Sequence, residues 1–262
     1  LNSVYDQLNS MAGGQDNHSA LQEHTTDELM GPTRGTDWDD FGNWRKLHQH
    51  TWNGAHNQLI GAWNQLNIGS YRATQVLANT GLTSQQKGEA SFLRAYFMYE
   101  IMDMFGQVPN RNPSDDINVN PSVMTRSEAF DYVKTDLTTA ISSLSNGSTS
   151  SAGVASKQAA QALLARLMLN KAVYKSDPRS PAGPFTFDKA DMDAVIANCD
   201  AIIATGNYEL MPTGSYYKNF YWNNAADSKE IIFRSNNKEK GSVSTNVRWM
   251  TYMGNHYNQT PS

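Results

Sequence analysis

The chain has 262 residues, a formal net charge of −4, and only 18% charged against 39% hydrophobic residues. This length allows one large domain or two small ones, with enough buried surface for a proper core. The scattered lysines and arginines argue against nucleic-acid binding, which normally needs a basic patch. Abundant Asn, Gln, Ser and Thr suit hydroxyl-rich ligands better than polyanions. No apolar run approaches the 18 residues of a membrane-spanning helix.

The lone cysteine and the start of the chain limit the chemistry and the completeness that we expect of this protein. Cys199 can form no disulfide and no cysteine-based zinc site within the chain, and its apolar helical context predicts a buried small hydrophobe. The chain begins at Leu1, without an initiator methionine or a signal peptide, inside a predicted helix. We therefore expect a fragment of a longer protein.

The first quarter of the chain combines a helix with a long segment that has no steady period. Residues 1–11 predict a helix that ends at Gly13 and Gly14. Residues 13–54 predict a long irregular loop, and such loops in compact domains are usually functional or disordered. Three tryptophans argue against disorder here: Trp38, Trp44 and Trp52.

Two long helices are predicted next. Residues 55–79 carry apolar side chains at helical spacing. Thr83 and Gln86 form a capping-box pattern that begins a helix reaching Phe105, where Gly106 ends it. Because this second helix is apolar on nearly all sides, we expect it to lie at the centre of its domain.

Three further helices are predicted in the rest of the chain. The capping-box pair Thr125 and Glu128 begins one that runs to Leu144, and Ser156 caps another that runs to about Tyr174. Asp188 begins the third, which Gly206 ends. Its apolar stripe consists of Met192, Val195, Ile196, Cys199 and Ile203. The run Glu230–Phe233 predicts a strand.

This order of elements predicts a mainly α fold built from tetratricopeptide-like antiparallel helix pairs, with long aromatic loops and minor β structure. The pairs are residues 55–79 with 83–105 and residues 125–144 with 156–174. Parallel-sheet enzyme folds are disfavoured because strand signals do not alternate with the helices. We expect a single domain over residues 1–262, with 13–54 as a ligand-candidate loop inside it.

Five ordered blocks resemble one family. Glu89–Tyr96 followed by Phe105–Pro109 is similar to the hallmark helix of SusD/RagB-type nutrient-binding lipoproteins of Bacteroidetes-like bacteria. The other blocks are Thr25–Glu28 with Arg34–Trp38, Thr125–Ala129 with Asp136–Ala140, Ser156–Arg166, and Gly206–Leu210 continuing through Tyr217–Phe220 to Glu230–Phe233. The resemblance therefore covers nearly the whole chain.

The resemblance implies a protein at the cell surface, lipid-anchored to the outer membrane above a SusC-like TonB-dependent transporter. Such a protein captures oligosaccharides, as in a starch-utilisation-type system of glycan uptake, or peptides in RagB-like relatives, and passes them inward without chemistry. Family members usually carry an N-terminal lipidated cysteine and continue well beyond this length. We therefore expect the anchor, and part of the ligand site, to lie outside this chain.

The ligand candidates lie in the early loop. The indoles of Trp38, Trp44 and Trp52 offer flat apolar faces on which sugar rings stack, and the alternative is that each pins the loop to the helices. The resemblance implies that Asp27 and Arg34 bind glycan hydroxyls. Carboxylate and guanidinium suit vicinal hydroxyls, but an internal salt bridge between the two is the alternative.

Metal sites are only weakly indicated, and we predict neither a metal nor another cofactor. Oxygen ligands for calcium are present at Asp37, Asp39, Asp40 and Asn43, but Phe41 interrupts the loop pattern. Histidines gather near Trp52, yet a His-x-His pair in a loop is weak evidence for zinc; they are His48, His50 and His56.

Two arginines in apolar helices and a second aromatic cluster are predicted to have structural roles. Arg94 and Arg166 lie in apolar helices and predict core ion pairs, because a buried charge must be paired. The partners to consider are Glu89, Glu100, Asp103 and Asp136. A second aromatic cluster favours packing, with a partner surface as the alternative; it contains Tyr208, Tyr216, Tyr217, Tyr221 and Trp222.

Oligosaccharide capture with delivery to a transporter is thus the favoured function. A peptide-binding relative and a helical-repeat scaffold that binds only protein are the alternatives. A glycoside hydrolase is disfavoured because no acid lies in a recognisable catalytic motif, although such an enzyme needs two carboxylates across a cleft. Common hydrolase, metalloprotease and phosphate-loop motifs are also absent from the sequence.

Overall fold

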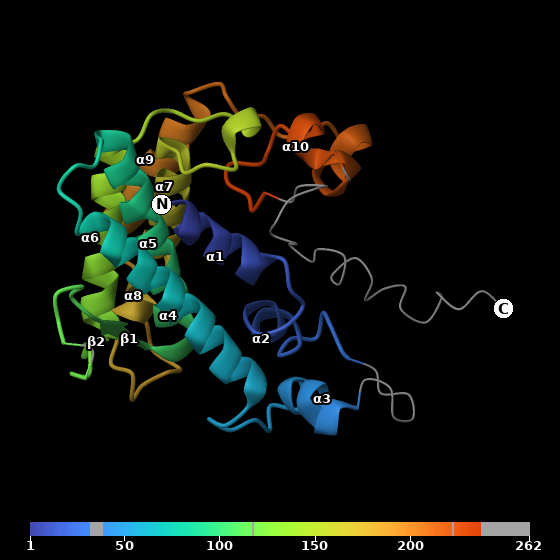
Figure 1. The fold of residues 1–262 in the computed structure, drawn as a ribbon. Helices are drawn as coiled ribbons and strands as arrows, with labels where there is room; N and C mark the ends of the chain where they lie inside the picture. Colours follow the sequence, from blue (N-terminus) through green and yellow to red (C-terminus); the bar gives the residue numbers. More distant parts are fainter. Residues whose placement is uncertain (32–38, 117, 222, 237–262) are drawn as a thin grey trace. The chain divides into compact units, whose positions relative to one another are not determined.

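The computed structural model describes residues 1–31, 39–116, 118–221 and 223–236 (Figure 1). It confirms a mainly α fold with minor β structure. Contacts divide the chain into two compact units. The N-terminal unit comprises residues 2–68 with 235–236, and the helical unit comprises residues 69–234. Among the helices of the described residues, none combines the length and apolar character that crossing a bilayer requires.

The N-terminal unit is built from short helices. Helix α1 (Asn2–Ala12) is followed by α2 (His18–Glu23), the 3-10 turn η1 (Asp40–Gly42), α3 (Asn43–His48) and the first half of α4 (Asn57–Leu77). The prediction that residues 13–54 are irregular throughout was therefore wrong. Helices of one or two turns are too short to show a period, and here a small shared core stabilises them. That core contains Ala20, Trp44 and Leu47, with Leu21 and Leu59 packed against it.

The helical unit centres on α5 (Ser84–Phe105), as its all-round apolar sequence predicted. The capping box at Thr83 and the left-handed Gly106, with φ of 72°, bound this helix as expected. Helix α5 packs mainly on α6 (Arg126–Ser143), α6 on α7 (Lys157–Leu169), and α7 on α9 (Lys189–Ile203). The tetratricopeptide-like helix pairs are thus confirmed.

Several short elements complete the helical unit. Asn170 separates α7 from α8 (Lys171–Tyr174), where the sequence predicted one continuous helix. The others are η2 (Thr149–Ser151), η3 (Thr213–Phe220) and α10 (Asn224–Asp227).

The β structure lies elsewhere than predicted. Strands β1 (Gln107–Asn110) and β2 (Ser122–Thr125) form an antiparallel pair in which Gln107 faces Thr125. Glu230–Phe233, the predicted strand, forms only bends. This run instead packs through its side chains: the ring of Phe233 meets Phe92 edge-on at 4.9 Å between centroids.

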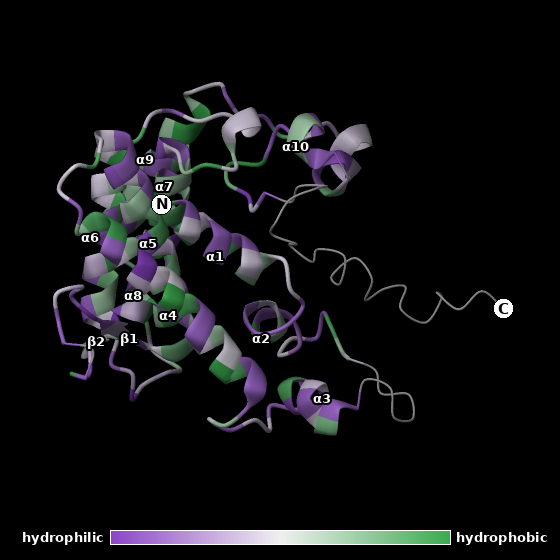
Figure 2. Cartoon of the chain, viewed as in Figure 1, coloured by the Kyte–Doolittle hydropathy of each residue, from purple (hydrophilic) through white to green (hydrophobic). Residues whose placement is uncertain are grey.

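Helix α9 exposes three of the five residues of its apolar stripe, namely Ile196, Cys199 and Ile203. Among its residues only Asp191 and Ile202 are buried, whereas Ile196 and Ile203 are 57% and 70% exposed. Cys199 lies on the same stripe and is exposed, so the prediction of a buried thiol was wrong. Helical spacing reveals an apolar face but not which neighbour covers it, and α7 packs on an adjacent face. Figure 2 shows hydrophilic and hydrophobic residues intermixed along the helices of this unit.

Candidate ligand-binding site

The candidate loop is held in place by polar contacts within the N-terminal unit. The Nε2 atom of His56 lies 3.1 Å from the carbonyl oxygen of Asn43, and that of His50 lies 2.8 Å from the carbonyl oxygen of Thr25. The short helices and these two histidine hydrogen bonds fix the backbone from which the loop's described side chains project. Two of the three clustered histidines thereby have backbone partners.

Trp44 is a packing residue of this loop. Its indole is only 4% exposed and lies against the ring of His24, with 4.7 Å between ring centroids. The Nε1–H group donates a hydrogen bond of 2.6 Å to Oδ2 of Asp40. Both contacts fix α3 against α2 and η1. The burial favours the anchoring alternative for Trp44.

Trp52 and Phe41 are exposed aromatic rings in the described part of the same loop. Trp52 is 36% exposed and its ring lies 5.2 Å from that of His50. Phe41 is 92% exposed and has a left-handed backbone, with φ of 56°, next to Gly42. The sequence interpretation used Phe41 only as a break in a calcium pattern. The signal that could have singled it out is an aromatic residue inside a polar turn.

The charged candidates are only partly described. Asp27 is exposed, as a residue that meets ligand hydroxyls must be. Arg34, Asp37 and Trp38 lie outside the described residues. The assignment of Asp27 and Arg34 to ligand binding therefore stays a prediction.

Calcium and zinc find no ready-made site in the described ranges. In these parts of the chain, no group of three or more His, Cys, Asp or Glu side chains is arranged to hold a metal ion. Two of the acidic candidates have other partners: Asp39 pairs with Arg45 at 2.7 Å, and Asp40 accepts from Trp44.

Acidification is expected to destabilise the N-terminal unit through His24. Burial is the main cause that lowers the pKa of this imidazole, and within the described residues neither ring nitrogen has a hydrogen-bond partner. The unfolded chain then takes up a proton below about pH 6.5 that the folded state excludes. Stability should therefore fall as the pH drops from about 7 to 5, because protonation favours the unfolded chain.

Urea unfolding of the wild type and of His24→Phe at both pH values tests this expectation. The variant keeps an aromatic ring beside Trp44 but cannot titrate, so its loss of stability on acidification should be smaller. An equal loss in both proteins would show that His24 does not couple protonation to folding.

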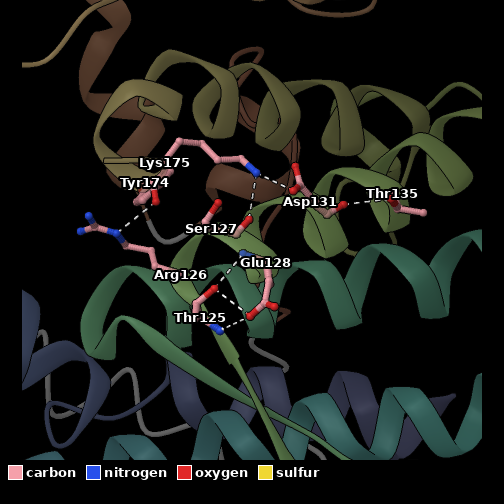
Figure 3. A network of polar contacts seen from close by, with 8 residues as sticks. All are labelled: Thr125, Arg126, Ser127, Glu128, Asp131, Thr135, Tyr174 and Lys175. Carbon is pink, nitrogen blue, oxygen red and sulfur yellow. Dashed lines mark hydrogen bonds and ion pairs between the residues drawn. The ribbon is translucent and has the colours of Figure 1, made fainter. Parts of the chain in front are cut away.

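In the helical unit, a polar network joins the start of α6 to α8 (Figure 3). Thr125 and Glu128 form the predicted capping box, which lowers the pKa of the Glu128 carboxyl through the backbone and hydroxyl hydrogen bonds of Thr125. The Nζ atom of Lys175 donates to the carbonyl oxygen of Ser127 at 3.0 Å and also pairs with Asp131. The capping box and the lysine therefore occupy both acidic side chains of this turn.

Arg94 and Asp136 form the predicted core ion pair. The Nε and Nη2 atoms of Arg94 each donate a 2.7 Å hydrogen bond to the carboxylate, and the side chains are 15% and 7% exposed. Burial alone would lower the pKa of Arg94, but the hydrogen bond and charge of Asp136 raise it. The same prediction for Arg166 was wrong, because this residue of α7 is exposed rather than in the core.

The second aromatic cluster is largely exposed. Tyr216, Tyr217 and Tyr221 are 56%, 60% and 47% exposed. Tyr208 is partly buried, and Trp222 lies outside the described residues. Tyr216, Tyr217 and Tyr221 thus contribute surface rather than core, which is the exposure that the partner-surface alternative requires.

These features define a helical-repeat protein that presents aromatic side chains from an ordered loop. A family model described as "Starch-binding associating with outer membrane", SusD-like, matches residues 2–169. The match covers more than half of the chain, and the chain belongs to this SusD-like family. No curated protein matches it significantly.

Solved structures agree on the fold. Surface glycan-binding protein A from Bacteroides fluxus superimposes with a TM-score of 0.70 at 22% identity, covering 92% of this chain and 50% of its own. A SusD-like protein from Bacteroides fragilis gives 0.62 at 23% identity, covering 90% and 44%. A laminarin-binding SusD-like protein gives 0.63 at 20% identity, covering 83% and 45%. This chain thus spans about half the length of these relatives.

Proposed function

We propose that this protein captures oligosaccharides at the cell surface and delivers them to a SusC-like TonB-dependent outer-membrane transporter without altering them chemically. The observation that carries the proposal is the match to the starch-binding family together with exposed aromatic rings on an ordered loop. Structural relatives named for glycan and laminarin binding support the same ligand class. In the full-length protein, a lipid anchors this domain to the outer membrane.

Within the loop, Trp52 is proposed as a direct stacking platform, and the exposed ring of Phe41 as a second aromatic contact. Asp27 and Arg34 are proposed to bind sugar hydroxyls, and Trp38 to add a second indole. Trp44, although a candidate from sequence, is proposed to support the site by fixing the loop. Few aromatic contacts give weak binding, which suits a protein that must release its ligand to a transporter.

Trp52→Ala is expected to weaken binding of a neutral oligosaccharide about fivefold, because one aromatic contact contributes about 1 kcal/mol. Calorimetric titration with laminari-, malto- and xyloglucan oligosaccharides measures the effect. Tyr217→Ala removes an exposed ring from the other unit and is the matched control, with an unchanged affinity expected. The melting temperature of both variants should stay that of the wild type.

Other outcomes would point to the alternative functions. Binding of peptides without any response to oligosaccharides would favour a RagB-like peptide-capturing protein. Retention on an immobilised transporter without any ligand response would favour a scaffold. Release of new reducing ends from a bound glycan would indicate a hydrolase. The scaffold result and the hydrolase result would each reject capture without chemistry.

A further inference from the structure

A polar groove lies in the helical unit, and none of the candidate loop residues is among its lining. It has a volume of about 550 Å³ and is lined by α4, α5, the residues after β1, and α6. Its lining is rich in hydroxyl and amide groups, which include Ser91, Asn110, Asn112, Tyr132, Thr135 and Thr139. Groups of this kind form hydrogen bonds with a polyhydroxylated ligand.

Arg94 contributes a donor to this groove that its ion pair leaves unused. Its Nε and Nη2 atoms donate to Asp136, whereas Nη1 has no partner among the described residues and is not fully enclosed. The guanidinium also lies 5.0 Å from the ring centre of Tyr132. Because the ion pair and the ring fix the guanidinium, its remaining N–H groups have a set direction and little entropy to lose.

The groove is locally cationic although the chain is acidic overall. Lys87, Arg94 and Arg111 line it, with Asp136 as its sole carboxylate, so three cations less one anion leave a formal charge of +2. Lys87 is exposed, and its side-chain ammonium forms no hydrogen bond or ion pair with any described residue. Arg111 donates to the backbone carbonyls of Asp116 and Val119, which places its charge without neutralising it.

A second hollow of about 420 Å³ shares Arg94 and Tyr132 with this groove and carries Glu128 and Asp131. These two acids are already occupied by the capping box and by Lys175 (Figure 3). An anionic group is therefore favoured on the Lys87 side, while an uncharged part of the same ligand can extend past Tyr132.

We propose that this groove binds a uronic-acid-type residue of an oligosaccharide, with its carboxylate received by Arg94 and Lys87. The amides and hydroxyls of the lining bind the sugar hydroxyls. The low overall charge of the chain argues against polyanions, but one carboxylate fits the local excess of positive charge. The inference rests on the proposed capture of oligosaccharides and adds a second site with its own ligand class.

Calorimetry with trigalacturonate and with its neutral galactose counterpart tests the groove. We expect binding of the uronide that weakens as salt rises from about 50 to 500 mM. Lys87→Glu should weaken it about tenfold or more, since an attraction becomes a repulsion. Lys87 lies in the first turns of α5, where glutamate suits the helix dipole, so the fold should be unaffected.

Lys134→Glu is the matched control, because it makes the same charge change at an exposed position of α6 outside the groove. Equal weakening in both lysine variants, or equal affinity for the charged and neutral sugars, would overturn the assignment. Tighter binding of triaspartate than of the uronide would also overturn it, in favour of a peptide site. Neutral-sugar binding that depends on Trp52, together with no binding of the uronide, would support the proposed function while rejecting the groove.

Discussion

Asp136→Asn is expected to lower the free energy of unfolding by about 3–5 kcal/mol, because it leaves the guanidinium of Arg94 buried without its counter-charge. The two side chains are only 15% and 7% exposed, so the pair is largely shielded from water. The pair joins α5 to α6, and its loss weakens the main helix contact of the unit. Urea unfolding followed by circular dichroism measures the change.

Asp193→Asn provides the control for this prediction. It makes the same chemical change in the ion pair with Lys189, whose side chains are 55% and 86% exposed. Exposed pairs contribute about 0.2–1 kcal/mol, so the control should unfold almost as the wild type does. Equal stability of the two variants would show that the Arg94 pair is not buried in solution.

Phe97→Ala is expected to cost about 3–5 kcal/mol, since it empties a ring-sized volume in the core of the helical unit. Phe97 is 0% exposed, and its ring lies against Gly69 so closely that a Cβ atom there would be 2.4 Å from a ring carbon. The free energy of unfolding measured in urea gives the magnitude. A glycine inside α4 is thus explained by the ring that occupies the space beside it.

A double-mutant cycle identifies that contact. Gly69→Ala alone should destabilise by about 1–3 kcal/mol through overpacking. In the Phe97→Ala background the added methyl group enters the vacated space, so the same change should cost less or even stabilise. Additive effects would contradict the close approach. Gly81→Ala, with open space around its Cβ position, is the neutral comparison.

The helices were predictable because their signals are local. Both capping boxes, at Thr83 and Thr125, and the glycine that ends α5 were read from residues three or four positions apart. The central place of α5 followed from apolar residues all around it. These features depend on the chain within one element, and they recur in the structure with their expected partners.

The predictions that were wrong depend on contacts between different helices and strands. The exposure of Cys199 depends on which face of α9 contacts α7, and spacing within one helix does not contain that information. Glu230–Phe233 resembles a strand, but in the described part of the chain no strand pairs with it. Strands β1 and β2 are only four residues each, too short for an alternation to stand out.

The ligand candidates illustrate the same limit. Sequence placed Trp44 and Trp52 together as candidate platforms, whereas their exposed fractions of 4% and 36% separate them. That difference arises because Asp40 and His24 both contact Trp44. The polar groove was missed because its lining comes from four separate segments. Arg94 was interpreted from its own helix, as a core residue alone.

The reciprocal caps of α5 and α6 have a thermodynamic consequence for the groove. Lys87 lies one turn after Thr83, and Glu128 is itself part of the second cap. Helix ends secured in this way resist fraying, so a ligand meets groups that are already ordered. The heat capacity change on association should then reflect only the surface removed from water, without an added contribution from coupled folding.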